Sequence, residues 1–370
     1  MAHGVGSEID DERLEGVSVK DLMSTTIFPI APSMRERSAM HYTGTIWRPP
    51  YEADSLIIEA TAGCTHHRCK FCTLYEDLPF KFRPSPLEDI EADLLEAQTW
   101  YHDPLRKAEE HLFELPGARA SRIFLAGANP FGLKALHLRK IASLVRTYFP
   151  QCKSIGCFSR VTDVAAKTDE ELAELAAAGF DGLTIGIETG DEEALAFMDK
   201  GYGAEEIVEQ CARLDAVGIS YAFFYLVGIS GAGRGLVGAR ATADVCNRTS
   251  PWLIGANMLT IYRSSALYRE IEAGRWREAA EVEKYEEVKE LVAQLDIPVE
   301  FAMLGASNPV MLHGRLPEQR EGLLAALGAV ISDIGEERLR RYRVNLRHLW
   351  EVREKVPTWV ICEKGAEDAS

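Results

Sequence analysis

The chain has 370 residues, 46% hydrophobic and 26% charged, a composition typical of a globular protein with a sizeable core. Its formal net charge of −16 argues against a general nucleic-acid surface, which would need a basic patch. No apolar run approaches membrane-spanning length, and the first residues lack the basic and apolar regions of a signal peptide. We therefore expect a cytoplasmic protein that does not contact a membrane and whose cysteines are not paired as disulfides.

Residues 1–45 have weak periodicity and several chain-breaking residues, and we interpret them as an N-terminal extension that either drapes over the domain or is partly disordered. From residue 46 onwards, apolar runs alternate with segments of helical periodicity. Six of these runs have the near-continuous apolar character of strands that are buried on both faces of a parallel sheet. They lie at residues 55–61, 122–126, 154–158, 182–188, 221–227 and 254–261.

Local signals predict where several helices begin and end. Ser85 and Glu88 form a capping box with a proline at the first helical position, and Thr168 with Glu171 forms a second one. Gly179 is expected to end the helix that follows Thr168. Near the C-terminus we expect a strand at 299–303, a helix over 317–342, and a solvated basic face made of Arg338, Arg340, Arg341, Arg343 and Arg347.

Six strand–helix units in series predict right-handed crossovers and a curved parallel sheet with helices outside. Because a closed barrel of this kind needs eight strands, the predicted fold is an α/β protein with an open, six-stranded (β/α)6 partial barrel of the TIM type. We assign residues 46–300 to this barrel. Residues 301–370 are interpreted as a C-terminal elaboration and tail packed on it.

Cys64, Cys69 and Cys72 lie within nine residues, on a loop that leaves the first predicted strand. Thiolates are soft ligands that suit zinc or an iron–sulfur cluster, and a cube held by three cysteines leaves one iron open. A zinc site with His66 or His67 as fourth ligand is an alternative. A dithiol redox pair is a further one, although that motif normally opens a helix. The loop alone leaves these alternatives open.

The loop resembles the signature of the radical S-adenosylmethionine (SAM) superfamily, which follows the first barrel strand and ends in Cys-x-aromatic-Cys, as Cys69, Lys70, Phe71 and Cys72 do here. Four residues separate the first two cysteines, where the commonest family pattern has three. At the fourth strand end, the run from Gly186 to Gly190 closely resembles the branch that includes methylthiotransferases and oxygen-independent coproporphyrinogen oxidases.

The resemblance implies a SAM site at the carboxyl ends of the strands, where parallel α/β folds bind ligands. Asn129 would hold the methionyl amino group, Ser159 and Arg160 the carboxylate, and Glu188 the ribose hydroxyls. From the residues alone, the turn around Asn129 is equally an ordinary loop and Arg160 equally a surface residue. The cofactor-binding residues that the resemblance implies are Phe71 (packing on adenine), Gly127, Asn129, Ser159, Arg160, Glu188 and Gly228 (backbone approach to the adenosyl group).

As to function, the resemblance implies a [4Fe–4S] cluster and SAM as cofactors, an electron donor such as flavodoxin or ferredoxin, and a 5′-deoxyadenosyl radical that abstracts hydrogen from a substrate. We find neither a recognisable cobalamin domain nor a second compact cysteine cluster, and the acidic charge disfavours tRNA, so a small-molecule substrate is favoured. An RNA- or peptide-modifying radical SAM enzyme is the alternative. In a different class, the chain would be a zinc-stabilised, non-catalytic binding module. Cys157 and Cys246 are expected to be small buried hydrophobes.

Overall fold

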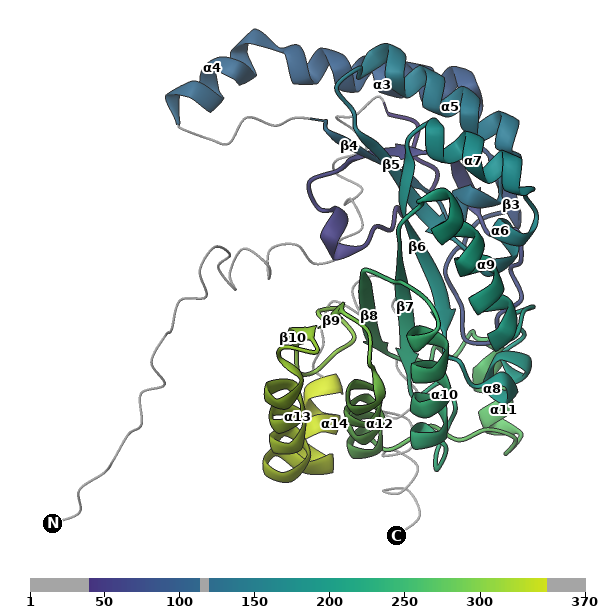
Figure 1. The fold of residues 1–370 in the computed structure, drawn as a ribbon, viewed down its shortest axis with the longest axis vertical. Helices are drawn as coiled ribbons and strands as arrows, with labels where there is room; N and C mark the ends of the chain where they lie inside the picture. Colours follow the sequence, from purple (N-terminus) through teal and green to yellow (C-terminus); the bar gives the residue numbers. More distant parts are fainter. Residues whose placement is uncertain (1–39, 114–119, 345–370) are drawn as a thin grey trace, which may run out of the picture.

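The computed structural model of the chain describes residues 40–113 and 120–344. Within these residues the fold is organised around one eight-stranded sheet whose strand order is β1-β4-β5-β6-β7-β8-β9-β10 (Figure 1). The strands are β1 (Leu56–Glu59), β4 (Arg122–Ala126), β5 (Ser154–Ser159), β6 (Phe180–Glu188), β7 (Tyr221–Val227), β8 (Leu253–Met258), β9 (Val299–Met303) and β10 (Leu312–Leu316).

The first six strands of this sheet are the six predicted apolar runs, and each pairs in parallel with the next. The prediction of an open parallel α/β sheet is therefore confirmed, and all six carboxyl ends lie at one edge. The sheet continues further than six strands, because β9 pairs in parallel with β8 and β10 returns antiparallel beside β9.

The long helices between consecutive strands lie along the outer face of the curved sheet, whereas α4 extends past the sheet (Figure 1). None of the helices in the described part of the chain is long and apolar enough to cross a membrane. In chain order they are α3 (Leu87–His102), α4 (Pro104–Leu112), α5 (Ala135–Tyr148), α6 (Val161–Ala165), α7 (Asp169–Ala177), α8 (Glu192–Phe197), α9 (Ala204–Val217), α10 (Gly235–Asn247), α11 (Ala266–Glu272), α12 (Glu281–Gln294), α13 (Arg320–Ala329) and α14 (Gly335–Val344).

Of the two predicted capping boxes, one forms. Thr168 Oγ1 accepts a hydrogen bond from Glu171 N at 3.2 Å, and the Glu171 carboxylate accepts one from Thr168 N at 3.0 Å. The box at Ser85 was wrong: α3 begins at Leu87, and the Ser85 hydroxyl donates to Glu59 at 3.4 Å instead. Glu59 is 2% exposed, and a buried carboxylate without a hydrogen-bond donor is costly. The Ser85 hydroxyl therefore bonds to Glu59 and does not cap α3.

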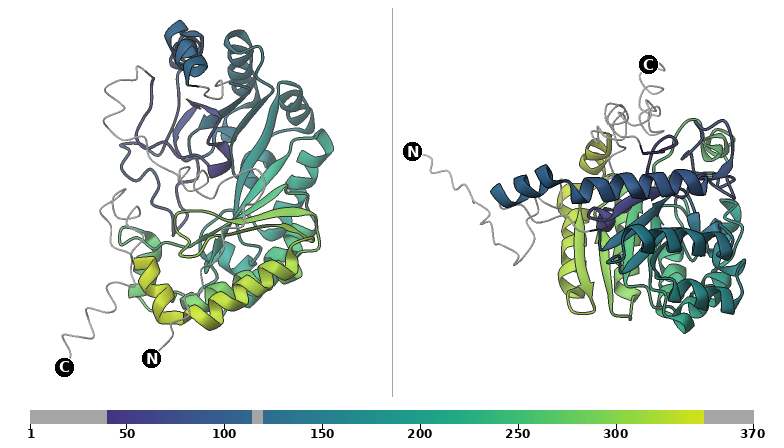
Figure 2. Two further views of the ribbon diagram at one scale, coloured as in Figure 1. Left: turned by 90° about the vertical axis from the view of Figure 1, so that its left-hand side faces the viewer. Right: turned by 90° about the horizontal axis from the view of Figure 1, so that it is seen from above.

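The predicted C-terminal helix is present as α13 and α14, joined by a short π-helical turn at Val330–Ile334, and both pack beside α12 (Figure 2). The prediction of a solvated basic face was wrong for Arg343, whose side chain is 1% exposed. Its guanidinium lies 3.3 Å from Glu281 and donates to the main-chain oxygen of Leu259 at 2.6 Å. The packing of α14 on α12 turns this arginine inward. Arg347 lies outside the described residues.

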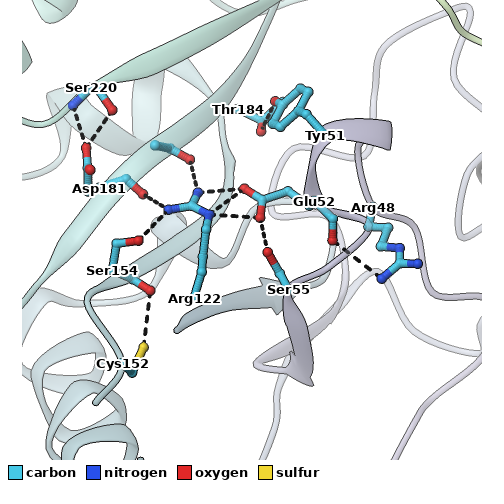
Figure 3. Close-up of polar contacts among 11 residues, drawn as sticks. Arg48, Tyr51, Glu52, Ser55, Arg122, Cys152, Ser154, Asp181, Thr184 and Ser220 are labelled. Carbon is cyan, nitrogen blue, oxygen red and sulfur yellow. Dashed lines mark hydrogen bonds and ion pairs between the residues drawn. The ribbon is translucent and has the colours of Figure 1, made fainter. Parts of the chain in front are cut away.

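The amino ends of the strands are closed by a short 3-10 helix, η1 (Pro50–Glu52) (Figure 3). Glu52 is 1% exposed and accepts hydrogen bonds from Arg122 Nε at 2.9 and 3.0 Å. Arg122 also donates to Ser154 Oγ at 2.8 Å and to two main-chain oxygens of β6 at 3.2 Å. Tyr51 enters the sheet's concave side, where its hydroxyl lies 2.6 Å from Thr184 Oγ1. This end is therefore sealed by structural contacts, which leaves the carboxyl ends of the strands for chemistry.

Candidate active site

The cysteine loop stands at the carboxyl end of β1. After β1 the chain forms β2 (Thr61–Gly63), which pairs antiparallel with β3 (Phe82–Pro84) on the far side of the loop. Cys64 N donates to Lys81 O at 2.8 Å, which closes the loop at its base. A Cβ on Gly63 would lie 2.1 Å from that same oxygen, so only glycine fits here. The antiparallel pair of β2 and β3 thus fixes the position of the Cys64 main chain.

The other end of the motif is clamped from both sides. Lys70 N donates to Met198 O at 3.0 Å, in the turn after α8, while Lys70 O accepts from Leu267 N at 2.7 Å, in the first turn of α11. The Lys70 ammonium lies 3.1 Å from Glu270 on α11. Main-chain contacts therefore hold the segment that carries Cys69 and Cys72 without using either thiol.

The donor chemistry of the three loop thiols suits an iron–sulfur cluster. Cys64 and Cys69 are half-buried and Cys72 is exposed. Within residues 40–113 and 120–344, no three His, Cys, Asp or Glu side chains lie close enough together to hold one metal ion. A [4Fe–4S] cluster accepts wider spacing because each thiolate binds its own iron. His66 Nε2 contacts the main-chain oxygen of Asp199, so it is not a ready fourth ligand. The donor set therefore fits the cluster.

Glu188 and Lys200 form an ion pair beside the cysteine loop. Glu188 ends β6 with a φ of +65°, and its carboxylate folds back over Gly186, where a Cβ would lie 2.7 Å from Oε1. Lys200 Nζ lies 3.0 Å from Glu188 Oε1 and 5.7 Å from the centre of the Phe71 ring. Burial lowers the pKa of the Lys200 ammonium, but Glu188, Tyr202 and Cys69 together raise it well above its usual value. The lysine therefore stays charged.

Lys200 is the functional candidate that the sequence analysis missed. It lies in the turn between α8 and α9, where a lysine between Asp199 and Gly201 is an unremarkable loop residue. Burial raises the pKa of the nearby Cys69 thiol, while the charges of Lys200 and Arg160 lower it. The available signal was the buried carboxylate of Glu188, since a partly buried glutamate at a strand end calls for a cation.

Ser159 and Arg160 lie at the carboxyl end of β5, as predicted, but their side chains support that turn. Ser159 Oγ donates to Arg160 O at 3.0 Å. The Arg160 guanidinium donates to Thr162 Oγ1 at 2.8 Å and to the main-chain oxygen of Lys200. Its guanidinium carbon lies 5.6 Å from the centre of the Tyr202 ring. The arginine therefore holds the lysine turn in place.

Asn129 is fully buried, and its side-chain amide is hydrogen-bonded to Thr65 of the cysteine loop. Its Oδ1 accepts from Thr65 N at 3.2 Å, and its Nδ2 donates to Thr65 Oγ1 at 2.6 Å and to Asp163 at 3.0 Å. Because both ends of the amide are engaged, this geometry gives Asn129 the role of fixing Thr65, next to Cys64. The Asn129 Oδ1 accepts one hydrogen bond and has a second acceptor position, so the predicted contact with the methionyl amine stays a prediction.

The two predicted glycines permit close backbone approaches. Gly127 has a φ of +133°, and a Cβ there would lie 2.0 Å from Thr61 Oγ1, so the residue lets β2 cross the end of β4. Gly228 has a φ of +86°, and its N–H donates to both carboxylate oxygens of Glu287 at 3.1 Å. Glu287 is fully buried on α12 and also accepts from the Tyr225 hydroxyl. Glu287 therefore ties the end of β7 to α12.

Glu287 gives a pH-dependent prediction. Burial raises the pKa of its carboxyl to about 7, although the Tyr225 and Gly228 hydrogen bonds lower it. An unfolded glutamate titrates near ~4.3, so the native state binds more protons between these values and the free energy of unfolding falls as the pH rises through them. Relative to Glu287→Gln, which cannot ionise, the wild type should lose on the order of 2 kcal/mol between pH 5 and pH 7.5. Urea unfolding at several pH values measures this. Parallel profiles for the two proteins would contradict it.

An apolar cluster lies beside the cysteine loop and the ion pair. Phe71 is partly buried against it, together with Leu226 of β7. Two of the buried members, Leu259 and Ile261, follow β8, so Phe71 lies beside the chain that leaves this strand. The buried members are Met198, Ile229, Leu259, Ile261 and Leu267. The cluster gives the site an apolar wall on which a planar group can pack.

The fold and the site together define an open α/β barrel with a loop of three cysteines at the carboxyl ends of its parallel strands. Residues 58–233 match the family model of the Radical SAM superfamily, and this part of the chain is a radical SAM domain. Members of this superfamily are enzymes that use a [4Fe–4S] cluster and SAM.

Solved structures of similar fold include three radical SAM enzymes. The methyltransferase TsrM from Kitasatospora setae is 18% identical, with 61% of this chain and 40% of that chain covered and a TM-score of 0.45. Coproporphyrinogen III oxidase (HemN) from Escherichia coli is 17% identical, with 65% and 51% covered and a TM-score of 0.47. Methylornithine synthase (PylB) is 14% identical, with 84% and 80% covered and a TM-score of 0.45. The chain thus spans about half or less of the length of the first two. No curated protein matches it in sequence.

Proposed function

We propose that the chain cleaves SAM reductively to methionine and a 5′-deoxyadenosyl radical, which abstracts a hydrogen atom from a small-molecule substrate. The observation that carries the proposal is the clamped three-cysteine loop with the Glu188–Lys200 pair beside it, 3.0 Å between the charged atoms. Bound by Cys64, Cys69 and Cys72, a [4Fe–4S] cluster would supply one electron to the sulfonium of SAM and a coordination site for its methionyl group.

In this proposal the protein's own groups bind and orient SAM. Lys200 offers a charge to the methionine carboxylate, and Glu188 accepts hydrogen bonds from the ribose hydroxyls. Phe71 packs on the adenine from the apolar cluster. Arg160 acts indirectly, by holding the main chain of Lys200. The backbone of Gly228 approaches the adenosyl group.

The remaining parts of the proposal concern context. Residues 46–300 would form the catalytic barrel, 1–45 the extension and 301–370 the elaboration. The electron donor would be a flavodoxin or ferredoxin in the cytoplasm, where the free thiols of the described cysteines would persist. The formal net charge of −16 disfavours a nucleic-acid substrate.

Metal and product analysis tests the proposal. Protein reconstituted anaerobically with iron and sulfide should be brown, absorb near ~400 nm and contain about four irons per chain. With dithionite and SAM it should release 5′-deoxyadenosine and methionine. About eight irons per chain would contradict the single cluster. A colourless protein that retains zinc and produces no 5′-deoxyadenosine would overturn the proposed function.

A further inference from the structure

A cavity of about 240 Å³ opens on the concave side of the sheet, beyond the ion pair. Three of its lining residues form a row across neighbouring strands, in which Phe224 pairs with Gly255 and Gly255 with Ala302. The row continues outside the lining to Gly186, which pairs with Phe224. Residues paired in this way face the same side of a sheet. The Phe224 ring leans over Gly255, where a Cβ would lie 3.3 Å from two ring carbons, and the small side chain of Ala302 leaves space beside it. The Glu188 carboxylate lies over Gly186, at one end of this row.

The cavity has an aromatic floor and reaches the cofactor side. At the amino ends of the strands, Tyr51 closes it, with its ring 5.0 Å from that of Trp252 in an edge-to-face contact. At the carboxyl ends, Asn257 lines it and pairs in register with Leu226, which packs against the same apolar cluster as Phe71. The space therefore runs from the sealed end of the barrel towards the proposed SAM site.

The lining is almost entirely apolar, with three polar exceptions. Glu300 is engaged by Arg315 at 2.7 Å and by His313 at 3.2 Å. Among the described residues no hydrogen bond joins the Asn257 side-chain amide to a partner, so it is open to a ligand. Among the described residues no lysine or arginine lines the cavity, and His313 already contacts Glu300, so a carboxylate or phosphate would find no free cation there.

We propose that this cavity binds the substrate, and that the part it binds is an uncharged, largely apolar group, aromatic or branched aliphatic, with one hydrogen bond to Asn257. The inference rests on the proposed function and names the substrate class for it. An apolar cavity of ~150 Å³ holds benzene, so this one has room for about ten non-hydrogen atoms. Such sites combine apolar walls with a few polar groups that set the ligand's orientation.

Calorimetric titrations of the full chain with three small probes separate what apolar contact, one hydrogen bond and a negative charge each contribute to binding. Toluene tests the apolar walls, benzyl alcohol adds one hydroxyl group, and benzoate adds a negative charge. We expect toluene and benzyl alcohol to bind at one site, and benzoate to bind at least about tenfold more weakly because it loses its hydration without gaining a cation. Asn257→Leu should weaken benzyl alcohol about fivefold and leave toluene unchanged, as expected for one hydrogen bond.

Filling the cavity locates the site. Ala302→Leu should weaken both uncharged probes at least about tenfold, because its side chain occupies their volume. Val237→Ala, at an exposed position on α10, is the matched control and should bind them as the wild type does. If Ala302→Leu fails to fold by circular dichroism, Leu304→Trp narrows the same cavity from a partly exposed position.

Failure of the inference is distinct from failure of the proposed function. Wild-type protein that releases 5′-deoxyadenosine but binds neither uncharged probe would overturn the apolar substrate site and leave SAM cleavage standing. Equal binding of the probes by the filled variants, or benzoate binding as tightly as benzyl alcohol, would likewise overturn it. Probe binding with the expected pattern together with release of 5′-deoxyadenosine supports the substrate class, whereas probe binding without that release would overturn the proposed function and leave only an apolar ligand site.

Discussion

Replacing any one of Cys64, Cys69 and Cys72 by alanine will abolish the release of 5′-deoxyadenosine from SAM and dithionite. A cube that loses one of three protein thiolates loses its anchorage and its single open iron together, so the three residues act as a unit. Their losses should therefore not add in double variants. Iron and sulfide content, absorbance and 5′-deoxyadenosine yield are measured on the same reconstituted samples, and each single variant should fall to the background of protein-free controls.

Two sets of variants give this prediction its controls. Cys157 and Cys211 are buried in the main core, and burial raises the pKa of both thiols, so they behave as small apolar residues. Cys157→Ser or Cys211→Ser should keep the cluster and the activity. His66→Gln should also keep the metal; if it does not, a zinc site with a histidine ligand replaces the cluster. A loop-cysteine variant with wild-type yield would show that this loop is not the active centre.

The strands were predictable because their signal is local. A strand buried on both faces of a parallel sheet has to be apolar along its whole length, whichever helices cover it. The run at 221–227 and strand β7 coincide residue for residue. Strand β10 carries His313 and Arg315 on its exposed face, so its sequence has no such run, and it was missed. Edge strands depend on their neighbour for recognition.

The location of a site side chain was predictable only where its position in the sequence, at the end of an apolar strand, determines it. Glu188 lies where the end of an apolar strand puts it, and so does the cysteine loop. The direction in which a long side chain points depends on contacts made by distant residues. Arg343 is buried because α14 packs on α12, and Asn129 turns to Thr65, 64 residues away in the chain. No local pattern contains either fact.

Glu188→Gln and Lys200→Met should each weaken SAM binding about 10- to 100-fold while leaving the cluster intact. Charge-assisted hydrogen bonds in a partly buried site contribute on the order of 1–3 kcal/mol, which corresponds to that range. Gln keeps the shape of Glu188 but removes its charge, and Met keeps the length of Lys200 without its ammonium. Equilibrium binding of SAM to reconstituted protein measures the effect, and iron content shows whether the cluster is retained.

Rescue and coupling separate recognition of SAM from a merely structural ion pair. Lys200→Arg retains the charge and should recover most of the affinity, whereas a loss caused only by disturbed packing would persist in the larger side chain. In the double variant Glu188→Gln, Lys200→Met, the penalties should be less than additive, because each single change already breaks the 3.0 Å contact between the two residues. If Glu188→Gln binds SAM as tightly as the wild type, the carboxylate does not recognise the ribose. The pair would then hold only the turn that carries Lys200 against the end of β6.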